Sequence, residues 1–212
     1  MGSDHYFSAQ PAGPEKRRPL QVILSGQKRQ LTTAAGIFSP DAIDKGTAML
    51  LAHAPAPAEQ GNLLDIGCGW GPVALTLALR SPGARVFAVD INERSVSLTR
   101  DNADTLGLSN VTASLPGEVD PLLTFNTIWS NPPIRVGKDE LHALLRLWLP
   151  RLAPGGLAYL VVQKNLGADS LQRWLTAEFP TLGVDRHSTA KTFRILEISR
   201  TDGNWEHRET GK

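Results

Sequence analysis

The stretch that decides the fold reads Leu63-Leu64-Asp65-Ile66-Gly67-Cys68-Gly69-Trp70-Gly71-Pro72. An apolar strand runs into a loop with glycine at every second position, and a helix then begins. Glycines at this spacing let the backbone turn sharply and approach a ligand with no Cβ in the way. The helix N-terminus that follows leaves free N–H groups and a partial positive charge facing that ligand. The stretch therefore predicts a loop that binds a cofactor containing a nucleoside.

The spacing of the glycines bears on which cofactor this is. Nicotinamide and flavin dinucleotides are bound by the fingerprint G-x-G-x-x-G/A. Counted from Gly67, the last position of that fingerprint falls on Pro72, which does not fit. Counted from Gly69, it falls on Ala74, which does. The glycines alone therefore leave a dinucleotide open.

Two acids favour a different cofactor. Asp65 stands two residues before the first glycine, and the pattern D-x-G-x-G-x-G resembles motif I of the class I methyltransferases that use S-adenosylmethionine (SAM). A second apolar strand, predicted over Arg85–Val89, ends in Asp90. A carboxylate at such a strand end can accept hydrogen bonds from both ribose hydroxyls of a nucleoside. Together the two segments favour SAM over a dinucleotide.

Length and composition are typical of one globular domain. The chain has 212 residues, of which 41% are hydrophobic and 20% are charged, and its net charge is +1. Its single cysteine, Cys68, excludes an internal disulfide and suits a reducing compartment. No apolar run reaches the roughly 18–20 residues that span a bilayer, residues 1–19 do not resemble a signal peptide, and the five histidines lack metal-ligand spacing. We expect a cytoplasmic protein with neither a membrane nor a metal partner.

The two ends of the chain are expected to be appendages. Residues 1–36 are predicted to form an arm, over residues 1–19, and a hairpin. Strands over 21–24 and 29–33 would flank the turn Ser25-Gly26-Gln27. Residues 201–212 are polar and are predicted to form a flexible tail.

Strands and helices alternate between these ends, over residues 37–200. A first helix is predicted from Ser39, its cap, with Pro40 at its first position, to about His53. The predicted strands span 63–66, 85–89, 111–113, 127–130, 157–162 and 193–198. Apolar residues recur at helical spacing in two segments, Leu141, Leu144, Leu145, Trp148 and Leu152, then Leu171, Trp174, Leu175 and Phe179. Alternating units with apolar strands predict a parallel sheet with helices on both faces.

A second motif follows the fourth strand of this series. Ser130 ends the strand, and Asn131-Pro132-Pro133-Ile134 comes next. Read alone, the tetrad ends a strand and begins a turn. In an open α/β sheet, however, ligands bind at the carboxyl ends of the strands, so the tetrad would share a crevice with the glycine loop. It resembles motif IV, N-P-P-[YFWLI], of methyltransferases that act on planar amino or amide nitrogens.

The chemistry of such a nitrogen explains these residue types. Its lone pair is delocalised, so it is a poor nucleophile. The side-chain oxygen of Asn131 and the carbonyl of Pro132 can accept its two N–H groups, and proline adds a stiff carbonyl without a competing donor. Preorganised acceptors of this kind favour the reaction without a strong base. Pro133 and Ile134 would shape the slot for the acceptor.

The resemblance extends over about residues 5–200 to the small-methyltransferase domain family, which includes the RsmC-like ribosomal RNA guanine-N2 methyltransferases. It is carried by Tyr6-Phe7, Gly36-Ile37-Phe38-Ser39 and Asp44-Lys45-Gly46-Thr47, in order before the two motifs. The resemblance implies a Rossmann-like, seven-stranded, mostly parallel sheet. It also implies that Phe38 and Lys45-Gly46-Thr47 line the cofactor pocket. The full set expected to hold SAM is Phe38, Lys45, Gly46, Thr47, Asp65, Gly67, Cys68, Gly69, Asp90, Ile91 and Asn131.

The resemblance implies that the substrate is a guanine of ribosomal RNA, methylated on its exocyclic N2. Adenine-N6 methylation of RNA, methylation of a protein glutamine amide, and a non-catalytic module that binds SAM and RNA remain alternatives. Ile134 stands where many relatives have an aromatic residue, which weakens stacking on a base. Basic residues could form a rim that holds RNA phosphates: Arg135, Lys138, Lys164, Lys191 and Arg194, with Lys16, Arg17, Arg18, Lys28 and Arg29 near the start.

Overall fold

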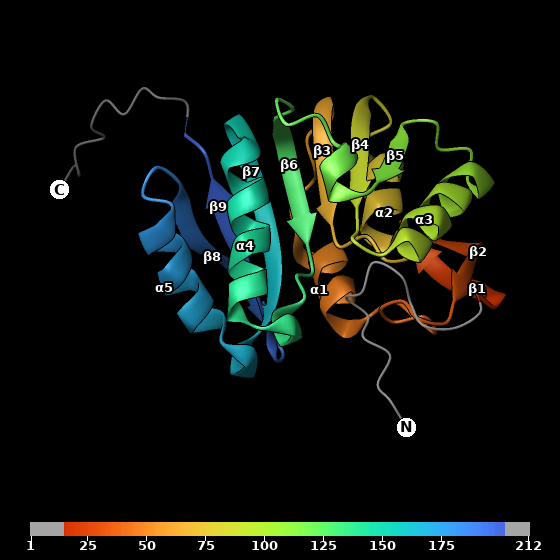
Figure 1. The fold of residues 1–212 in the computed structure, drawn as a ribbon, viewed down its shortest axis with the longest axis horizontal. Coiled ribbons are helices and arrows are strands. Elements are labelled where there is room, and N and C mark those ends of the chain that lie inside the picture. The colour runs from red at the N-terminus through yellow and green to blue at the C-terminus, as the bar shows by residue number, and fades with distance from the viewer. Residues whose placement is uncertain (1–14, 202–212) are drawn as a thin grey trace.

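Seven strands form the central sheet of the molecule (Figure 1). The computed structural model describes residues 15–201. In space the strands have the order β5-β4-β3-β6-β7-β9-β8, parallel from β5 to β7, with β9 antiparallel to both β7 and β8. Their bounds are β3 (Gly61–Ile66), β4 (Ala84–Val89), β5 (Val111–Ser114), β6 (Phe125–Ser130), β7 (Leu152–Gln163), β8 (Gly183–Ala190) and β9 (Phe193–Ser199). The seven-stranded, mostly parallel α/β fold expected from the sequence is confirmed.

Two strands differ from the sequence prediction. Leu152, predicted on a helix, is instead the first residue of β7, because the α-helix ends at Trp148 and is followed by a 3-10 turn, Leu149–Arg151, that contains Pro150. Strand β8 has no counterpart among the predicted strands. Its sequence is largely polar and its side chains are mostly exposed, since it is an edge strand of the sheet and pairs only with β9.

Helices cover both faces of the sheet. In Figure 1, α4 and α5 lie in front of it and α1 and α2 lie behind, while α3 packs along β5. The helices are α1 (Lys45–His53), α2 (Pro72–Arg80), α3 (Glu93–Thr105), α4 (Lys138–Trp148) and α5 (Ala168–Glu178), and the short 3-10 turns are η1 (Pro116–Glu118), η2 (Ile134–Val136), η3 (Leu149–Arg151) and η4 (Lys164–Leu166). Among the described residues, no helix has the length and apolar character to cross a membrane.

The prediction that the first helix begins at Ser39 and Pro40 is wrong. Ser39 has a φ of 45°, outside the helical region, and its hydroxyl donates to the carbonyl of Ala42. Helix α1 begins at Lys45, and the Asp44 carboxylate accepts from the N–H groups of the first turn. Residues 35–44 therefore form a loop that leads to α1.

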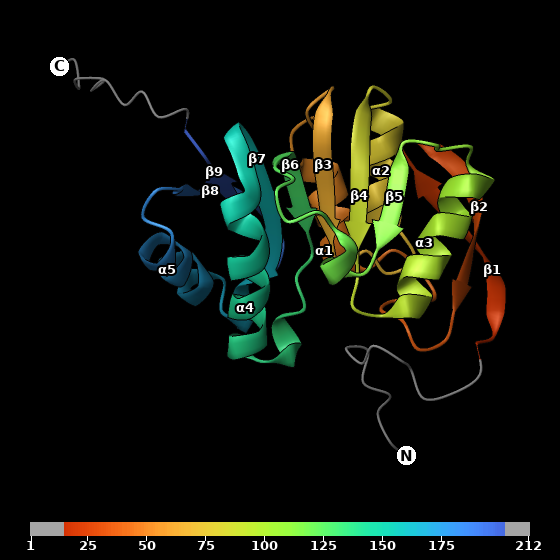
Figure 2. The same ribbon diagram turned by 45° about the horizontal axis from the view of Figure 1, so that its top comes forward.

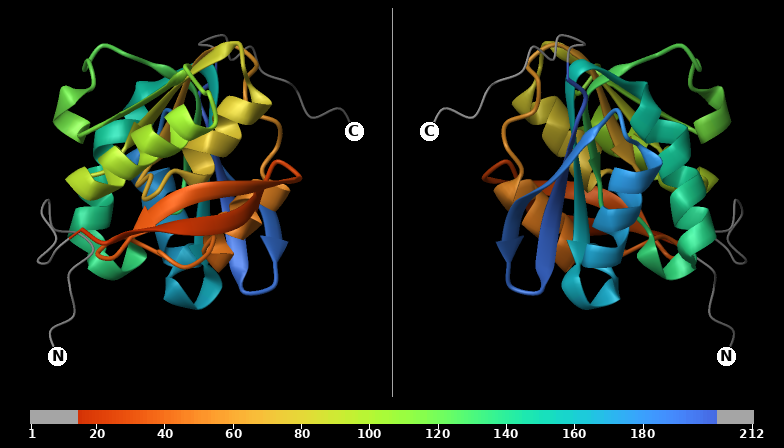
Figure 3. Two further views of the ribbon diagram at one scale, coloured as in Figure 1. Left: turned by 90° about the vertical axis from the view of Figure 1, so that its right-hand side faces the viewer. Right: turned by 90° about the vertical axis from the view of Figure 1, so that its left-hand side faces the viewer.

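An antiparallel hairpin, β1 (Arg17–Leu24) and β2 (Gln27–Ala34), forms a separate two-stranded sheet. The predicted hairpin is confirmed, although its first strand begins inside the predicted arm. The hairpin lies over α2 and α3 (Figure 3, left). Asn102 of α3 is fully buried and fastens it, because its side chain accepts from the N–H of Thr32 at 2.7 Å and donates to the Thr32 carbonyl at 2.9 Å.

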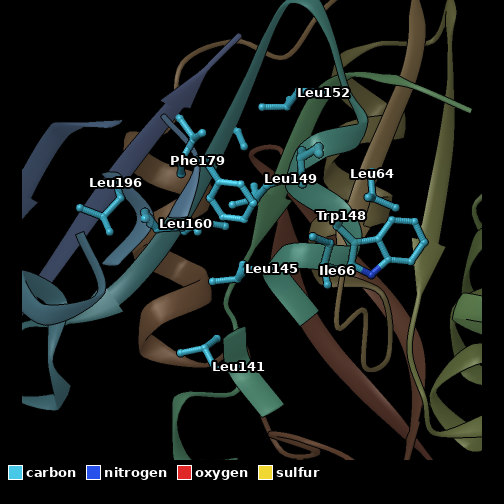
Figure 4. Close-up of a cluster of buried hydrophobic side chains, with 14 of the residues drawn as sticks. Leu64, Ile66, Leu141, Leu145, Trp148, Leu149, Leu152, Leu160, Phe179 and Leu196 are labelled. Carbon is cyan, nitrogen blue, oxygen red and sulfur yellow. The ribbon is translucent and has the colours of Figure 1, made fainter. Parts of the chain in front are cut away.

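The strand pleat divides the core between the two faces. Leu64 and Ile66 of β3 pack against α4 and α5, whereas Leu63 packs against α1 and α2. Figure 4 shows the first of these clusters, in which Trp148 of α4 lies beside Leu64 and Ile66. Because β3 is packed on both faces, its carboxyl end is held firmly at the lower edge of the sheet in Figure 2.

Candidate active site

The two predicted motifs meet where the order of the parallel strands reverses. The chain runs outward from β3 to β4 and β5 on one side, and β6 pairs with the other side of β3. The glycine loop follows β3 and the Asn-Pro-Pro-Ile tetrad follows β6, so both lie at the same edge of the sheet. Such a switch point is where open α/β sheets bind ligands.

The glycine loop is fixed by backbone hydrogen bonds and leaves space beside it. The N–H groups of Gly67 and Cys68 donate to the carbonyl of Val89 at 2.8 and 3.0 Å. Gly67 has a φ of 82°, and a Cβ at that position would meet no atom within 4 Å. The loop thus adopts a conformation that favours glycine and presents bare backbone to a cavity.

Asp65 is a buried acid behind this loop. It is 1% exposed, and its Oδ2 accepts from the N–H of Ala74 at 3.0 Å. Burial raises the pKa of Asp65 to about 8, and the charge of the nearby Asp90 adds to the rise. The carboxyl is therefore mostly protonated at neutral pH until a positive charge comes close.

Asp90 follows β4 and faces the same loop. Its Oδ2 accepts from the N–H of Gly69 at 3.0 Å and its Oδ1 from the N–H of Asn92 at 2.9 Å. Burial raises the pKa of Asp90, and hydrogen bonds from the N–H groups of Asn92, Gly69 and Ile91 and from the Ser95 side chain limit the rise. Asp90 lines the cavity with Ile91, which is 42% exposed.

Asn131 is held in one orientation by residues of the α1 start. Its Nδ2 donates to Asp44 Oδ2 at 2.9 Å and to Thr47 Oγ1 at 3.1 Å. Only the amide nitrogen can donate, so this network fixes which end of the side chain is the oxygen. The next residue, Pro132, is buried, and its carbonyl accepts from the N–H of Ile134 at 2.9 Å, which leaves one lone pair.

One cavity of about 470 Å³ is lined by Gly67, Asp90, Asn131 and Pro132. At one end lie Asp90 and Ile91, the tetrad lies in the middle, and a smaller pocket behind the glycine loop shares Phe38, Gly67 and Asn131 with it. Beyond the tetrad, the far end is lined by Leu144, Gln163, Leu166 and Phe193. Gln163 and Phe193 are paired neighbours on β7 and β9, so the antiparallel strand returns an aromatic side chain to this edge.

The structure places most predicted cofactor residues around these two pockets, namely Phe38, Thr47, Asp65, Gly67, Cys68, Gly69, Asp90, Ile91 and Asn131. Lys45 and Gly46 line neither. Lys45 is exposed on the first turn of α1, while Gly46 lies against the Asn131 side chain. Burial raises the pKa of the Cys68 thiol, which makes it a poor nucleophile.

Sequence reasoning missed Asp44, Gln163 and Phe193 as lining residues. Asp44 stands directly before Lys45-Gly46-Thr47, the segment predicted to line the pocket. Because aspartate is a preferred helix N-cap, its residue type could have placed it at the start of this helix and so beside the pocket. Gln163 and Phe193 carry no such signal, because only the antiparallel pairing of β7 and β9 brings them to the cavity.

The cations predicted to form a basic rim differ in exposure and in partners. Arg135, Lys138, Lys164 and Lys191 are exposed at the edge that carries the cavity, and Arg135 lines it. Arg194 does not belong to the rim, because it is 8% exposed and forms an ion pair with Asp169. Near the start, Arg17 pairs with Glu15 and Asp101, and Arg18 pairs with Asp41.

The donor set of the cavity fits SAM. The open space beside Gly67 accepts a ligand against bare backbone, Asp90 brings a carboxylate to the cavity where ribose hydroxyls could reach it, and Ile91 offers an exposed apolar surface to a base. The acids Asp65 and Asp90 suit a cofactor with positive charge. Within residues 15–201, no group of three or more His, Cys, Asp or Glu side chains could hold a metal ion.

Comparison with known proteins agrees with this geometry. The family model of the methyltransferase small domain matches residues 28–197. The uncharacterized protein YbxB of Bacillus subtilis is 34% identical over 185 residues, which cover 86% of this chain and 92% of YbxB. Ribosomal RNA small subunit methyltransferase C of Pseudomonas entomophila is 32% identical over 208 residues, which cover 93% of this chain and 58% of that protein.

Among solved structures, the 16S rRNA N2 G1207 methyltransferase RsmC of Thermus thermophilus, in complex with AdoMet and guanosine, superimposes with a TM-score of 0.72 at 23% identity. The match covers 88% of this chain and 51% of that one, and the chain spans 36 to 58% of the curated methyltransferase C relatives. The fold, the glycine loop and the match over residues 28–197 lead to one conclusion: the chain belongs to the methyltransferase small domain family and is a SAM-dependent methyltransferase.

Proposed function

We propose that the protein methylates the exocyclic N2 amine of a guanine in ribosomal RNA. The observation that carries the proposal is the oriented Asn131, with the Pro132 carbonyl beside it, on a cavity continuous with the glycine loop. The similarity to ribosomal RNA small subunit methyltransferase C supports the choice of RNA as substrate. We also infer that the protein works in the cytoplasm, where a free buried thiol such as Cys68 stays reduced.

The chain contributes acceptors and position to this reaction. When bound, SAM supplies an electrophilic methyl group, and we assign its ribose to Asp90 and the loop at Gly67 and Gly69. Asn131 Oδ1 and the Pro132 carbonyl would accept the two N–H groups of the amine and stabilise the nitrogen as it gains positive charge. The proton then passes from nitrogen to water, so no strong base is required.

The far end of the cavity is suited to a flat, apolar acceptor. Ile134, Leu144, Leu166 and Phe193 provide apolar walls, and Gln163 adds an amide able to hydrogen-bond a base edge. Phe193 compensates for the aliphatic Ile134, because base stacking needs only one aromatic face. A guanine would enter this space unpaired or flipped out of its helix.

The exposed cations at the same edge suit a nucleic acid. Arg135 and Lys138 follow the tetrad, while Lys164 and Lys191 flank the wall that carries Phe193. The N–H of Lys164 donates to the Thr192 carbonyl at 2.8 Å, which ties η4 to the β8–β9 turn. We assign these four cations to RNA phosphates, whose binding weakens steeply with salt.

A methyl-transfer assay tests the proposal. The protein is incubated with SAM labelled in the methyl group and with small-subunit ribosomal RNA from cells that lack the gene. Nuclease digestion and mass spectrometry should yield N2-methylguanosine. Asn131→Ala should bind SAM normally in calorimetry and turn over about 10²–10³-fold more slowly, as when one preorganised hydrogen bond is lost.

Other results would replace the proposal. N6-methyladenosine would change the acceptor base, and label in a protein glutamine, with RNA unmodified, would change the substrate class. SAM binding without transfer to RNA or ribosomal protein would make the chain a binding module. Normal turnover by Asn131→Ala would reduce the tetrad to a turn that ends β6.

A further inference from the structure

One carboxylate oxygen connects the start of α1 to the catalytic tetrad. Asp44 Oδ2 accepts from the N–H of Gly46 at 2.7 Å, from the N–H of Thr47 at 3.3 Å and from Nδ2 of Asn131 at 2.9 Å. The first two bonds are those of an ordinary helix cap. The third reaches a residue that lies 87 positions later in the chain, and capping α1 does not require it.

These contacts use both hydrogens of the Asn131 amide. One is donated to Asp44, and the other to the hydroxyl of Thr47, which is buried at 4% exposure. The Asn131 Oδ1 is thereby left to face other partners as an acceptor. A donor group bonded to a carboxylate is also polarised, which makes the carbonyl end of the same amide a stronger acceptor.

The backbone of Gly46 packs closely against this contact. A Cβ on Gly46 would lie 3.0 Å from Asp44 Oδ2, 3.1 Å from Asn131 Oδ1 and 3.2 Å from Asn131 Nδ2. A methyl group there would press on the amide. Glycine at this position therefore lets the helix start approach the tetrad closely.

We propose that Asp44, together with the Thr47 hydroxyl, is a positioning residue that orients Asn131 toward the acceptor amine. This role rests on the proposed function, in which Asn131 Oδ1 accepts an N–H of the substrate. Asp44 acts through Asn131, and it requires no contact of its own with the reacting atoms. The segment that begins α1 thus serves the acceptor as well as the cofactor.

The test uses variants that keep the helix cap. Asp44→Ser retains a capping hydroxyl, but that hydroxyl is too short to span the distance to Asn131. Thr47→Val removes the second acceptor with little change in shape, and Thr47→Ser is its matched control. We expect Asp44→Ser to lower kcat about 10- to 100-fold, the loss expected when a charged hydrogen-bond partner is removed. Because Asp44 and Thr47 also line the cofactor pockets, the Kd for SAM is measured by calorimetry for each variant and kcat is compared at saturating SAM.

A double-mutant cycle separates positioning from a structural effect. In an Asn131→Ala background, Asp44→Ser should cost no further activity, because the residue through which Asp44 acts is gone. Equal losses in both backgrounds, or an unchanged kcat in the single variant, would overturn the proposal.

A spectroscopic measurement keeps this inference separate from the proposed function. The side-chain amide signals of Asn131, assigned from their loss in Asn131→Ala, should exchange slowly with solvent and should shift and exchange faster in Asp44→Ser and Thr47→Val. The signals in Thr47→Ser should stay as in the unaltered protein. If the unaltered protein transfers no methyl group but the signals behave in this way, the orientation stands and the proposed reaction fails. Fast exchange in the unaltered protein would refute the orientation itself.

Discussion

Binding of SAM is expected to release a proton from Asp65. The side chain is 1% exposed and burial raises the pKa of its carboxyl to about 8. At pH 7 such a group is protonated in about nine of ten molecules. Asp65 lines the smaller pocket together with Gly67 and Asn131, which also line the large cavity, so a positively charged ligand in that cavity would favour the carboxylate.

The number of protons released follows from the size of the pKa shift of Asp65. If the bound cofactor returns the pKa of Asp65 to the ordinary range of an aspartate, binding at pH 7 releases about 0.9 proton. The affinity for SAM then rises with pH, by nearly tenfold per unit below about pH 7 and about fivefold between pH 7 and 8, and levels off above pH 8. Asp90, whose pKa is also raised by burial, would add to the slope in the same direction.

Calorimetry measures the proton count directly. The binding enthalpy is compared at pH 7 in buffers that differ in ionisation enthalpy, and the affinity is measured from pH 6 to 9. Asp65→Asn is the matched control, because it keeps the size of the side chain and an acceptor for the Ala74 N–H. Ionisation of SAM itself cancels in the difference between the two proteins. An equal proton count and an equal pH slope in both would refute the reasoning.

Four further outcomes are expected. Asp65→Asn should raise the free energy of unfolding of the free protein in urea, and more at pH 8 than at pH 5. The unfolded carboxyl ionises near pH 4, whereas the buried one keeps its proton to about pH 8, so the stability of the unaltered protein falls between these pH values. An equal gain at both pH values would contradict this. Asp90→Ala should lower the affinity for SAM, measured by calorimetry, about 10- to 150-fold, the cost of losing charge-assisted hydrogen bonds. Unchanged affinity would show that Asp90 does not bind the cofactor. Phe193→Leu should raise the KM for RNA about 5-fold or more with SAM affinity unchanged, and Phe193→Tyr should restore it; equal KM values would exclude stacking. Leu145→Ala, at a fully buried position, should lower the free energy of unfolding by about 2–5 kcal/mol, and a loss below about 1 kcal/mol would argue against the packing of α4.

Local chemistry explains what the sequence could predict. The glycine loop and the tetrad are contiguous motifs, and their glycines and prolines indicate the local backbone conformation. The strand before each motif is largely apolar because both of its faces are covered. Strand β8 could not be found in this way, since its polar residues are held mainly by pairing with β9.

The start of α1 shows a different limit. Ser39-Pro40 is a strong local signal for a helix, yet the carbonyl of Ser39 accepts from Trp70 Nε1 at 3.1 Å, which ties the segment to the glycine loop. A contact between segments thirty-one residues apart overrides the local preference. In the same way, the sequence predicts a cation of the basic rim at Arg194, whereas in the structure Arg194 forms an ion pair with Asp169.

The buried Asn102 that fastens the hairpin has a consequence for synthesis on the ribosome. Thr32 leaves the exit tunnel 70 residues before Asn102, which at about 5–20 residues per second is a delay of roughly 4–14 s. A two-stranded hairpin is at best marginally stable alone, and Leu20, Leu24 and Leu31 lack their packing partners on α2 and α3 until those helices are made. Strands β1 and β2 are synthesised before these helices, so for those seconds they expose apolar side chains, which makes a nascent chain prone to aggregation.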